Sequence, residues 1–251
     1  MPYCTAISRD LVDDPDTQSN RPFNTQPSIL HDEPEWFVLN KPICWHCVLA
    51  RVTDGNPTIQ DWLGESDPRQ RELPECGLVH RLDHSTSGCI LVAKNVQMHE
   101  TLRENFSVGF GGWAIEKRYL ALVGSGLDLR GEFALYFAGR HKGSAKVSVH
   151  AYGDRAERGE CRWTVVRKAS AMAKAGDPLS FDLVEVEVIG PGRRHQIRAG
   201  LSSLGHPLAG DSLYKGIALG EDWNGGCAAL HSWRLGITGI RVESPIPAWA
   251  E

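Results

Sequence analysis

Residues 77–95, GLVHRLDHSTSGCILVAKN, contain two apolar runs that are separated by a polar segment. The runs at 77–82 and 89–93 have the length and composition of buried strands, and we expect them to be paired or adjacent. Turns between such strands usually contain glycine, asparagine or proline, which suit the backbone of a turn. Arg81 and Asp83 at the end of the first run are not explained by turn geometry alone. The stretch therefore predicts two strands with Arg81 and Asp83 in the connection between them, and with TSG forming the tight return.

The sequence around this stretch predicts a mixed α+β fold. Short apolar runs and alternating patterns indicate strands at 36–39, 117–124 and 184–188, and an antiparallel sheet across 133–167. Helical spacing and capping residues indicate helices at 57–64 and 95–106, and a polar loop at 65–75 connects the first of these helices to the stretch at 77–95.

The segment FDLVEVEVIGPGRRHQIRAGLSSLGHPLAGDSLY, residues 181–214, has the clearest pattern in the chain. Its valines alternate with glutamates as in a half-exposed strand, which GPG then interrupts. Ile197, Leu201 and Leu204 recur at the spacing of a helix that ends at a glycine. Residues 193–195 lie at the predicted N-terminus of this helix, where unpaired backbone N–H groups and the dipole favour an anion.

Acidic side chains are concentrated near the N-terminus. Residues 1–35 contain seven of the 31 acidic residues and two of the 27 basic residues, which leaves the remaining chain close to neutral. Only local patches can therefore indicate a charged partner. Residues 1–28 lack a sustained apolar period, and we expect a flexible acidic arm there, followed by one folded domain over 29–251.

No apolar run is long enough to cross a bilayer, and the first residues lack a signal-peptide pattern. We therefore expect a cytoplasmic protein without a membrane partner. The seven cysteines have no repeated spacing, which favours reduced thiols over a disulfide framework. CWHC at 44–47, with Cys76 and His80, offers zinc-ligand types, but the second pair lacks the usual spacing. We predict buried thiols and no metal.

Several common catalytic patterns are missing from the sequence. It contains no GxxxxGK[ST] phosphate loop, no GxSxG elbow and no complete dinucleotide fingerprint. Phosphate-loop, serine-hydrolase and dinucleotide-dependent chemistry therefore have little support. The remaining candidates are Asp83, the strand tyrosine of KRYLALV and the basic helix start in GRRHQIR.

Five sequence blocks together resemble the RNA pseudouridine synthases of the RluA type. LVHRLDHSTSGCILVAKN is similar to their HRLDxxTSG signature, KRYLALV to their second motif, and GRRHQIRAGLSSLGHPLAGDSLY to their third. LNKP at 39–42 and ALHSWRL at 229–235 match two further blocks in the family's order. The resemblance covers residues 29–240. It implies a mixed, largely antiparallel β-sheet with flanking helices and a central catalytic cleft.

The resemblance implies an enzyme that detaches uracil from its ribose in RNA, turns the base and rejoins it through carbon. Asp83 is the implied essential carboxylate, acting by attack or by deprotonation, and Arg198 is its implied ion-pair partner. Tyr119 is implied to stack on the target base, and Leu230 to contact that base from below. Arg81 is implied to fill the space that the flipped nucleotide leaves.

Further RNA contacts are implied at the basic helix start. They belong to Arg193, Arg194, His195 and Gln196. The resemblance also implies rRNA or tRNA as the partner, no cofactor, and one catalytic domain over 29–251 without a basic S4-like domain. We expect a monomer.

The chain departs from the family pattern at several positions. His84 and Ser85 stand where a lysine and an acidic residue are common, Arg194 replaces a threonine, and no glycine follows the KP block. Gly200 lowers helix propensity by roughly 1 kcal/mol relative to alanine. These departures concern the choice of substrate more than the reaction.

Each assignment also has a structural alternative. A loop aspartate more commonly caps a turn, a strand tyrosine packs in the core, and Arg194 and Arg198 could be a solvated helix face. A catalytically silent RNA-binding module with the same fold is the second hypothesis, and binding to a protein surface is the third. The joint occurrence of Asp83, Tyr119 and Arg198 favours the enzyme.

Overall fold

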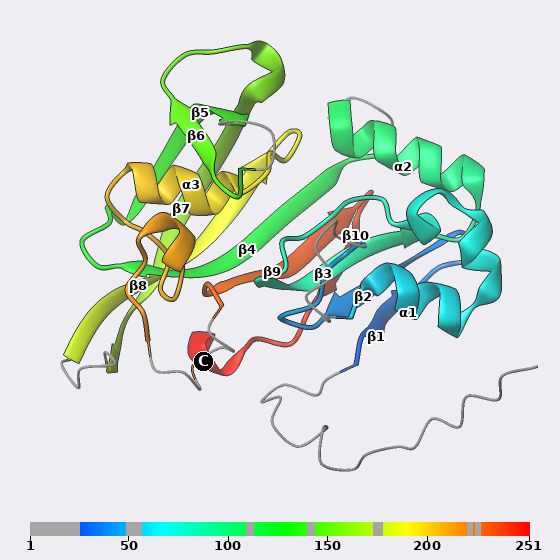
Figure 1. Cartoon of the computed structure of the whole chain (residues 1–251), viewed down its shortest axis with the longest axis horizontal. Helices are drawn as coiled ribbons and strands as arrows, with labels where there is room; N and C mark the ends of the chain where they lie inside the picture. Colours follow the sequence, from blue (N-terminus) through cyan, green and yellow to red (C-terminus); the bar gives the residue numbers. More distant parts are fainter. Residues whose placement is uncertain are drawn as a thin grey trace, which may run out of the picture.

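The computed structural model describes residues 26–48, 57–108, 113–139, 144–172, 178–219, 223 and 227–251. Within these residues, ten strands form one sheet in the order β1-β2-β3-β9-β4-β8-β7-β5-β6, with β10 paired to β9 (Figure 1). β3 and β9 are parallel, whereas the other neighbours are antiparallel. The prediction of a mixed, largely antiparallel α+β fold is confirmed. The predicted arm at 1–28 lies almost wholly outside the described residues.

The strands are β1 (Ser28–Asp32), β2 (Trp36–Lys41), β3 (Thr86–Ala93), β4 (Ile115–Gly124), β5 (Arg130–Gly139), β6 (Val147–His150), β7 (Arg158–Met172), β8 (Pro178–Ile189), β9 (Leu230–Ile237) and β10 (Ile240–Glu243). The α-helices are α1 (Ile59–Ser66), α2 (Val96–Val108) and α3 (Gln196–Ser203). Short 3₁₀ helices are η1 (Pro68–Glu72), η2 (Pro74–Gly77), η3 (Arg155–Glu157), η4 (Ser212–Tyr214) and η6 (Ala248–Ala250).

The three α-helices lie close to their predicted positions. Thr58 caps α1 by accepting a hydrogen bond from the backbone N–H of Asp61, and Asn95 caps α2 by accepting one from Met98. Such caps satisfy backbone donors that have no partner within the helix. The third helix, α3, begins one residue after His195, which has a left-handed backbone with φ of 53°.

The prediction of a strand at 77–82 is wrong. Glu75, Cys76 and Gly77 all have positive φ angles and turn the chain sharply, and Leu78 forms only an isolated bridge with Val92. Leu82 uses both its N–H and its carbonyl for hydrogen bonds with the Cys47 thiol. The segment therefore lacks the continuous ladder of backbone hydrogen bonds that defines a strand, although its composition is as apolar as that of a strand. The polar stretch at 65–75 is also not a plain loop, because it contains the end of α1, all of η1 and the first half of η2.

The TSG segment is the start of β3 and not a tight return. The turn lies at residues 83–86, where the N–H of Thr86 donates to the carbonyl of Asp83 at 3.0 Å. Gly88 has a φ of 103°, and a Cβ at this position would lie 2.1 Å from the carbonyl oxygen of Ser232. Glycine therefore lets β3 approach β9 closely.

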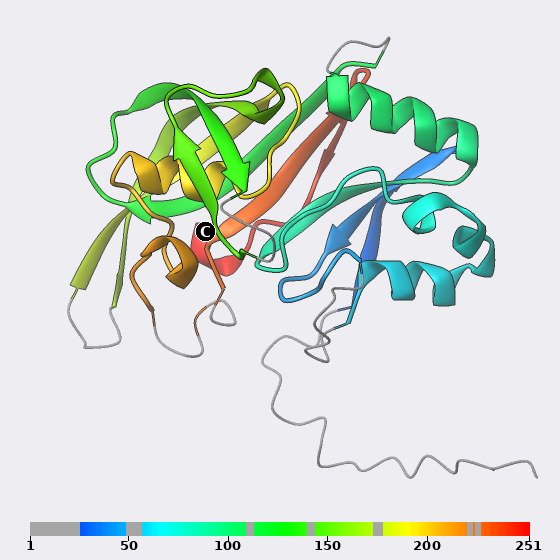
Figure 2. The same cartoon turned by 45° about the horizontal axis from the view of Figure 1, so that its top comes forward.

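The parallel pairing of β3 and β9 positions the cleft. Thr86 is in register with Leu230, so the turn that carries Asp83 and the start of β9 lie at the same end of the sheet. Helices α1 and α2 lie beside β1–β3, and α3 lies near β5–β7 on the other side of the long strand β4 (Figures 1 and 2). Tyr119 on β4 packs against two buried apolar clusters, one formed around β4–β8 and α3 and the other around β2, β3 and α1.

Candidate active site

A cleft of about 960 Å³ opens between the side of the sheet that contains β1–β3, with α1 and α2, and the side that contains β5–β7, with α3. All nine residues that the sequence predicted for the site line this cleft. They are Arg81, Asp83, Tyr119, Arg193, Arg194, His195, Gln196, Arg198 and Leu230. These residues come from the segment before β3, from β4, from the start of α3 and from the start of β9. The fold therefore brings together side chains that are up to 149 positions apart in the sequence.

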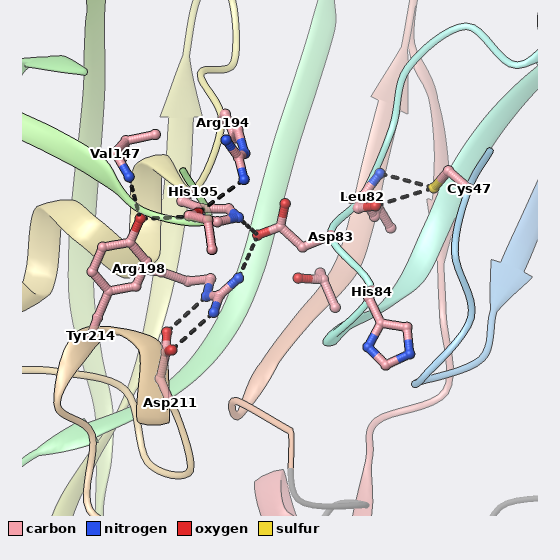
Figure 3. Close-up of polar contacts among 12 residues, drawn as sticks. Cys47, Leu82, Asp83, His84, Val147, Arg194, His195, Arg198, Asp211 and Tyr214 are labelled. Atoms are coloured by element: carbon pink, nitrogen blue, oxygen red, sulfur yellow. Dashed lines mark hydrogen bonds and ion pairs between the residues drawn. The ribbon is translucent and has the colours of Figure 1, made fainter. Parts of the chain in front are cut away.

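Asp83 and Arg198 form an ion pair in the cleft (Figure 3). The Nη1 atom of Arg198 donates to Oδ2 of Asp83 at 3.0 Å. The Arg198 side chain is 9% exposed, whereas that of Asp83 is 25% exposed. Asp83 is thus accessible from the cleft while Arg198 supports it from within. The predicted partnership between these residues is present in the structure.

Asp211, which sequence reasoning did not single out, holds the other edge of Arg198. Its two carboxylate oxygens accept hydrogen bonds from Nε at 2.7 Å and Nη2 at 2.9 Å. Burial alone would lower the pKa of Arg198, but the hydrogen bonds and charge of Asp211, followed by the charge of Asp83, raise this pKa above its ordinary value. The guanidinium is therefore a permanent cation with a fixed orientation.

Lys41 braces the turn that carries Asp83. Its side chain is fully buried, and Nζ donates to the backbone carbonyls of Pro42 at 3.0 Å, Thr86 at 2.7 Å and His84 at 3.4 Å. Burial lowers the pKa of Lys41 to about 8, although the nearby Cys47 and Asp83 act in the opposite direction. The LNKP block thus has a physical role, because its lysine ties the end of β2 to the Asp83 turn.

Tyr119 and Leu230 provide the apolar part of the cleft. Tyr119 projects from β4, where the pairing with β9 shifts register between Arg118 and Leu120. Burial raises the pKa of Tyr119 far above its ordinary value, so the phenol is neutral at physiological pH. Leu230, the first residue of β9, is 5% exposed and also lines the cleft. A planar, unsaturated ring could stack on the tyrosine.

His195 lies between Asp83 and Tyr214. Its Nε2 atom is 3.7 Å from Oδ2 of Asp83, and its Nδ1 atom is 2.8 Å from the hydroxyl oxygen of Tyr214. Tyr214 belongs to η4 and was not identified from the sequence. Burial lowers the pKa of His195, with the Asp83 charge acting against this and Arg198 and Arg194 acting with it.

The remaining predicted contacts differ in how much they can offer a ligand. Gln196 is 4% exposed; its amide nitrogen donates to the carbonyl of Glu160, and its amide oxygen accepts from the backbone N–H of Arg193. Gln196 therefore stabilises the protein's own structure. Arg194 is exposed but donates to the carbonyls of residues 144 and 145. Arg81 is exposed at the cleft. A role of these side chains in RNA binding stays a prediction.

The cysteines of CWHC contact different partners. The sulfur of Cys44 lies 3.1 Å from that of Cys227, whereas Cys47 bonds the backbone of Leu82. His80 accepts a hydrogen bond from the N–H of Leu91. Across the described ranges, no three His, Cys, Asp or Glu side chains are grouped as they would be around a metal ion. The arrangement of these residues therefore gives the zinc alternative no support.

The signal for the missed residues was present in the sequence. Asp211 and Tyr214 both belong to the GDSLY end of the third block, and Lys41 belongs to LNKP. A buried charge needs a partner, but the partner's identity depends on how α3, η4 and the Asp83 turn pack together. Each block alone therefore could not reveal the contacts.

Chemically, the cleft presents a carboxylate held by a buried guanidinium, beside a neutral phenol and an aliphatic wall. Such a site suits nucleophilic or base chemistry on a planar polar ring, with the carboxylate held in position by Arg198. Among the described helices, none is both long and apolar enough to cross a membrane.

Comparisons with known proteins agree with this geometry. A family model described as RNA pseudouridylate synthase matches residues 35–203. The chain is 30% identical over 190 residues to ribosomal large subunit pseudouridine synthase D of Xylella fastidiosa, covering 75% of this chain and 51% of that protein. It is 28% identical to an uncharacterised RNA pseudouridine synthase of Zymomonas mobilis, covering 87% of this chain and 93% of that protein.

The fold also matches solved structures. Human RNA pseudouridylate synthase domain containing 1 superposes with a TM-score of 0.62 at 23% identity, covering 88% of this chain and 84% of that one. Two relatives named ribosomal large subunit pseudouridine synthase D, from Xylella fastidiosa and Nitrosomonas europaea, are longer proteins, of which the chain spans 51% and 62%.

Proposed function

The chain belongs to the RNA pseudouridylate synthase family, and from this membership we propose that it isomerises uridine to pseudouridine in RNA. The observation that carries the proposal is the ion pair between Asp83 and the buried Arg198 inside a cleft that also contains Tyr119. A carboxylate that is held in this way can act on the sugar and base of a nucleotide that has been turned out of its stack.

The reaction is an isomerisation, so the product contains the same atoms as the substrate. The bond from C1′ to N1 breaks, the uracil turns, and a bond from C1′ to C5 forms. The proton on C5 is lost, and N1 gains one. Asp83 either adds to the sugar–base unit or removes a proton from it, while Tyr119 stacks on the base and Leu230 supports it from below. No step requires a cofactor.

The RNA class is proposed from the names of relatives. Two of them are named for the large ribosomal subunit, which makes large-subunit rRNA the first substrate to test, with tRNA as the other candidate. Mapping of pseudouridines in both RNA classes, from cells with and without the gene, tests this directly. Loss of a single site in rRNA supports the proposal, and an unchanged rRNA map with a lost tRNA site redirects it.

The decisive variant is Asp83→Asn, which removes the charge of the carboxylate but keeps its size. We expect the variant to fold and bind RNA like the wild type, with pseudouridine formation reduced by about 10⁴-fold or more, because the reactive carboxylate is lost. Asp128→Asn is the matched control, since Asp128 is exposed and lies outside the cleft. Pseudouridine formation by Asp83→Asn at the wild-type rate would refute the role of Asp83.

The alternative of a catalytically silent module is not favoured, because the matching relatives carry the names of synthases. It makes a different prediction, since RNA would be bound with the steep salt dependence of phosphate contacts but never modified. The expectations of a cytoplasmic location, of a monomer and of activity without a cofactor stay predictions.

A further inference from the structure

We propose that Tyr214 and His195 form a relay that positions Asp83, with the Tyr214 hydroxyl selecting the tautomer of His195 that presents an N–H group to the carboxylate. The contacts that carry this inference are two hydrogen bonds at the Tyr214 hydroxyl and the approach of His195 to Asp83 (Figure 3). The proposal rests on the proposed function, because Asp83 is the group that is positioned.

The Tyr214 hydroxyl has one hydrogen to donate. The backbone N–H of Val147 donates to its oxygen at 3.0 Å, so this contact does not use the hydroxyl hydrogen. The other contact of the hydroxyl is with Nδ1 of His195 at 2.8 Å. Among the described residues, the hydroxyl makes no hydrogen bond other than these two. The hydroxyl therefore donates to Nδ1, which must carry a lone pair.

A neutral imidazole with a lone pair on Nδ1 carries its hydrogen on Nε2. Nε2 is the atom that faces Oδ2 of Asp83 at 3.7 Å. The opposite tautomer would aim a lone pair at the carboxylate and would leave the hydroxyl hydrogen of Tyr214 without an acceptor. Both changes are unfavourable in a site where His195 is largely buried.

The doubly protonated imidazolium is the remaining alternative. The charged groups that face His195 are Asp83 and Asp211, which favour the cation, and Arg194 and Arg198, which oppose it. Burial adds to the opposition, and the net effect lowers the pKa of His195. The neutral form with its hydrogen on Nε2 is therefore the form present at physiological pH.

At 3.7 Å, the contact between Nε2 and Oδ2 is longer than a hydrogen bond. Catalytic hydrogen bonds often tighten when the substrate binds. Arg198 already holds the same oxygen of Asp83, and a donation from His195 would fix the carboxylate from a second direction. This leaves Oδ1 of Asp83 directed to the substrate. His195 is thus a positioning residue, and Tyr214 acts through it.

The backbone of His195 supports this assignment. Its φ of 53° lies in the left-handed region, which histidine, asparagine and aspartate adopt more readily than other residues with a Cβ. Such conformations cluster at functional sites because the surrounding structure has to maintain them. Here the left-handed residue ends the loop after β8 and places its ring between the Asp83 turn and η4.

The first experiment measures the tautomer and needs no substrate. Nuclear magnetic resonance of protein with ¹⁵N-labelled histidine distinguishes protonated from unprotonated ring nitrogens, and loss of one signal set in His195→Asn identifies His195. We expect an unprotonated Nδ1 and a protonated Nε2 at pH 7.5 in the wild type. A protonated Nδ1 would overturn the proposal, whether or not the protein makes pseudouridine.

The second experiment uses Tyr214→Phe, with Tyr152→Phe as its matched control because Tyr152 is 85% exposed. Tyr214→Phe should convert the single tautomer into a mixture, and the control should leave it unchanged. If Tyr214→Phe retains the pure tautomer, Tyr214 is not the selecting group and the relay is wrong. If the variant does not fold, the measurement on the wild type still decides.

Kinetics then separate positioning from RNA contact. His195→Asn should lower kcat by about tenfold with KM for RNA unchanged, since one hydrogen bond to a charged group is lost. Tyr214→Phe should lower kcat by a smaller factor, set by the fraction of His195 that still carries its hydrogen on Nε2, again with KM unchanged. His195→Asn suits this purpose because asparagine tolerates the left-handed backbone. A rise in KM with an unchanged kcat would mean that His195 contacts RNA instead, and it would overturn the relay. Inactive wild-type protein would refute the proposed function and leave the tautomer result standing.

Discussion

At the scale of single residues, the site depends on how a buried cation is oriented. Two of the three nitrogens of Arg198, Nε and Nη2, donate to Asp211, and the third, Nη1, donates to Asp83. A bidentate pair fixes the plane of the guanidinium as well as its position. The direction from which Asp83 is held is therefore determined by a residue that does not itself line the cleft.

Asp211→Asn should reduce catalysis without removing the Asp83 side chain or its direct partner. An amide can accept only one of the two hydrogen bonds, so Arg198 should turn, and kcat should fall by about 10- to 100-fold. The free energy of unfolding should fall by about 2 kcal/mol, because the buried guanidinium loses a charged partner. Asp128→Asn provides the exposed control for both steady-state kinetics and urea denaturation. An unchanged kcat with lowered stability would show that Asp211 supports only the fold.

At the scale of secondary-structure elements, α3 packs closer to β5 than a helix with a Cβ at position 200 could. A Cβ on Gly200 would lie 2.4 Å from the ring of Phe133 on β5. Gly200 is thus explained by packing, because it lets the helix that carries Arg198 approach β5. The sequence pattern revealed only the cost of this glycine in helix propensity.

Gly200→Ala should be destabilising even though alanine is the better helix former. Propensity alone predicts a gain of roughly 1 kcal/mol, whereas overlap with the buried Phe133 should cost about 1–3 kcal/mol. Thermal and urea unfolding measure the net sign. Gly139→Ala is the matched control, since a Cβ there meets no atom within 4 Å. Combining Gly200→Ala with Phe133→Leu should recover part of the loss, and a stabilised single variant would contradict the packing explanation.

The elements also show what sequence can predict. Helices α2 and α3 are predictable because helical spacing and local caps are encoded within a few residues. The run at 77–82 has a strand's composition, but it forms no continuous ladder, and the backbone groups of Leu82 bond the thiol of a distant segment, which no local pattern encodes. Asp83, Tyr119 and Arg198 were predictable through resemblance, whereas Asp211, Lys41 and Tyr214 required the packing of separate blocks.

At the scale of the whole molecule, buried histidines link stability to pH. Burial lowers the pKa of His80 to about 3, and Lys117 lowers it further in the same direction. Burial also lowers the pKa of His231 to about 4. Both rings serve as hydrogen-bond partners in the native state: His80 accepts from the N–H of Leu91, and His231 contacts Ser87. Each ring therefore stays neutral in the folded protein at pH values where the unfolded chain is protonated.

The free energy of unfolding should accordingly fall as the pH is lowered from 7 to 5. In this window the unfolded state binds protons at both histidines and the native state does not, so each histidine should contribute about 1–2 kcal/mol to the loss. His80→Gln keeps an acceptor for the N–H of Leu91 but cannot titrate. Between pH 7 and 5 its free energy of unfolding should therefore fall by about 1–2 kcal/mol less than that of the wild type. His150→Gln, at an exposed position, should not change the slope. Urea denaturation at pH 7, 6 and 5 measures these differences. Equal slopes for wild type and His80→Gln would mean that His80 becomes protonated in the folded protein, despite the hydrogen bond that it accepts from Leu91 and its stacking on Phe106.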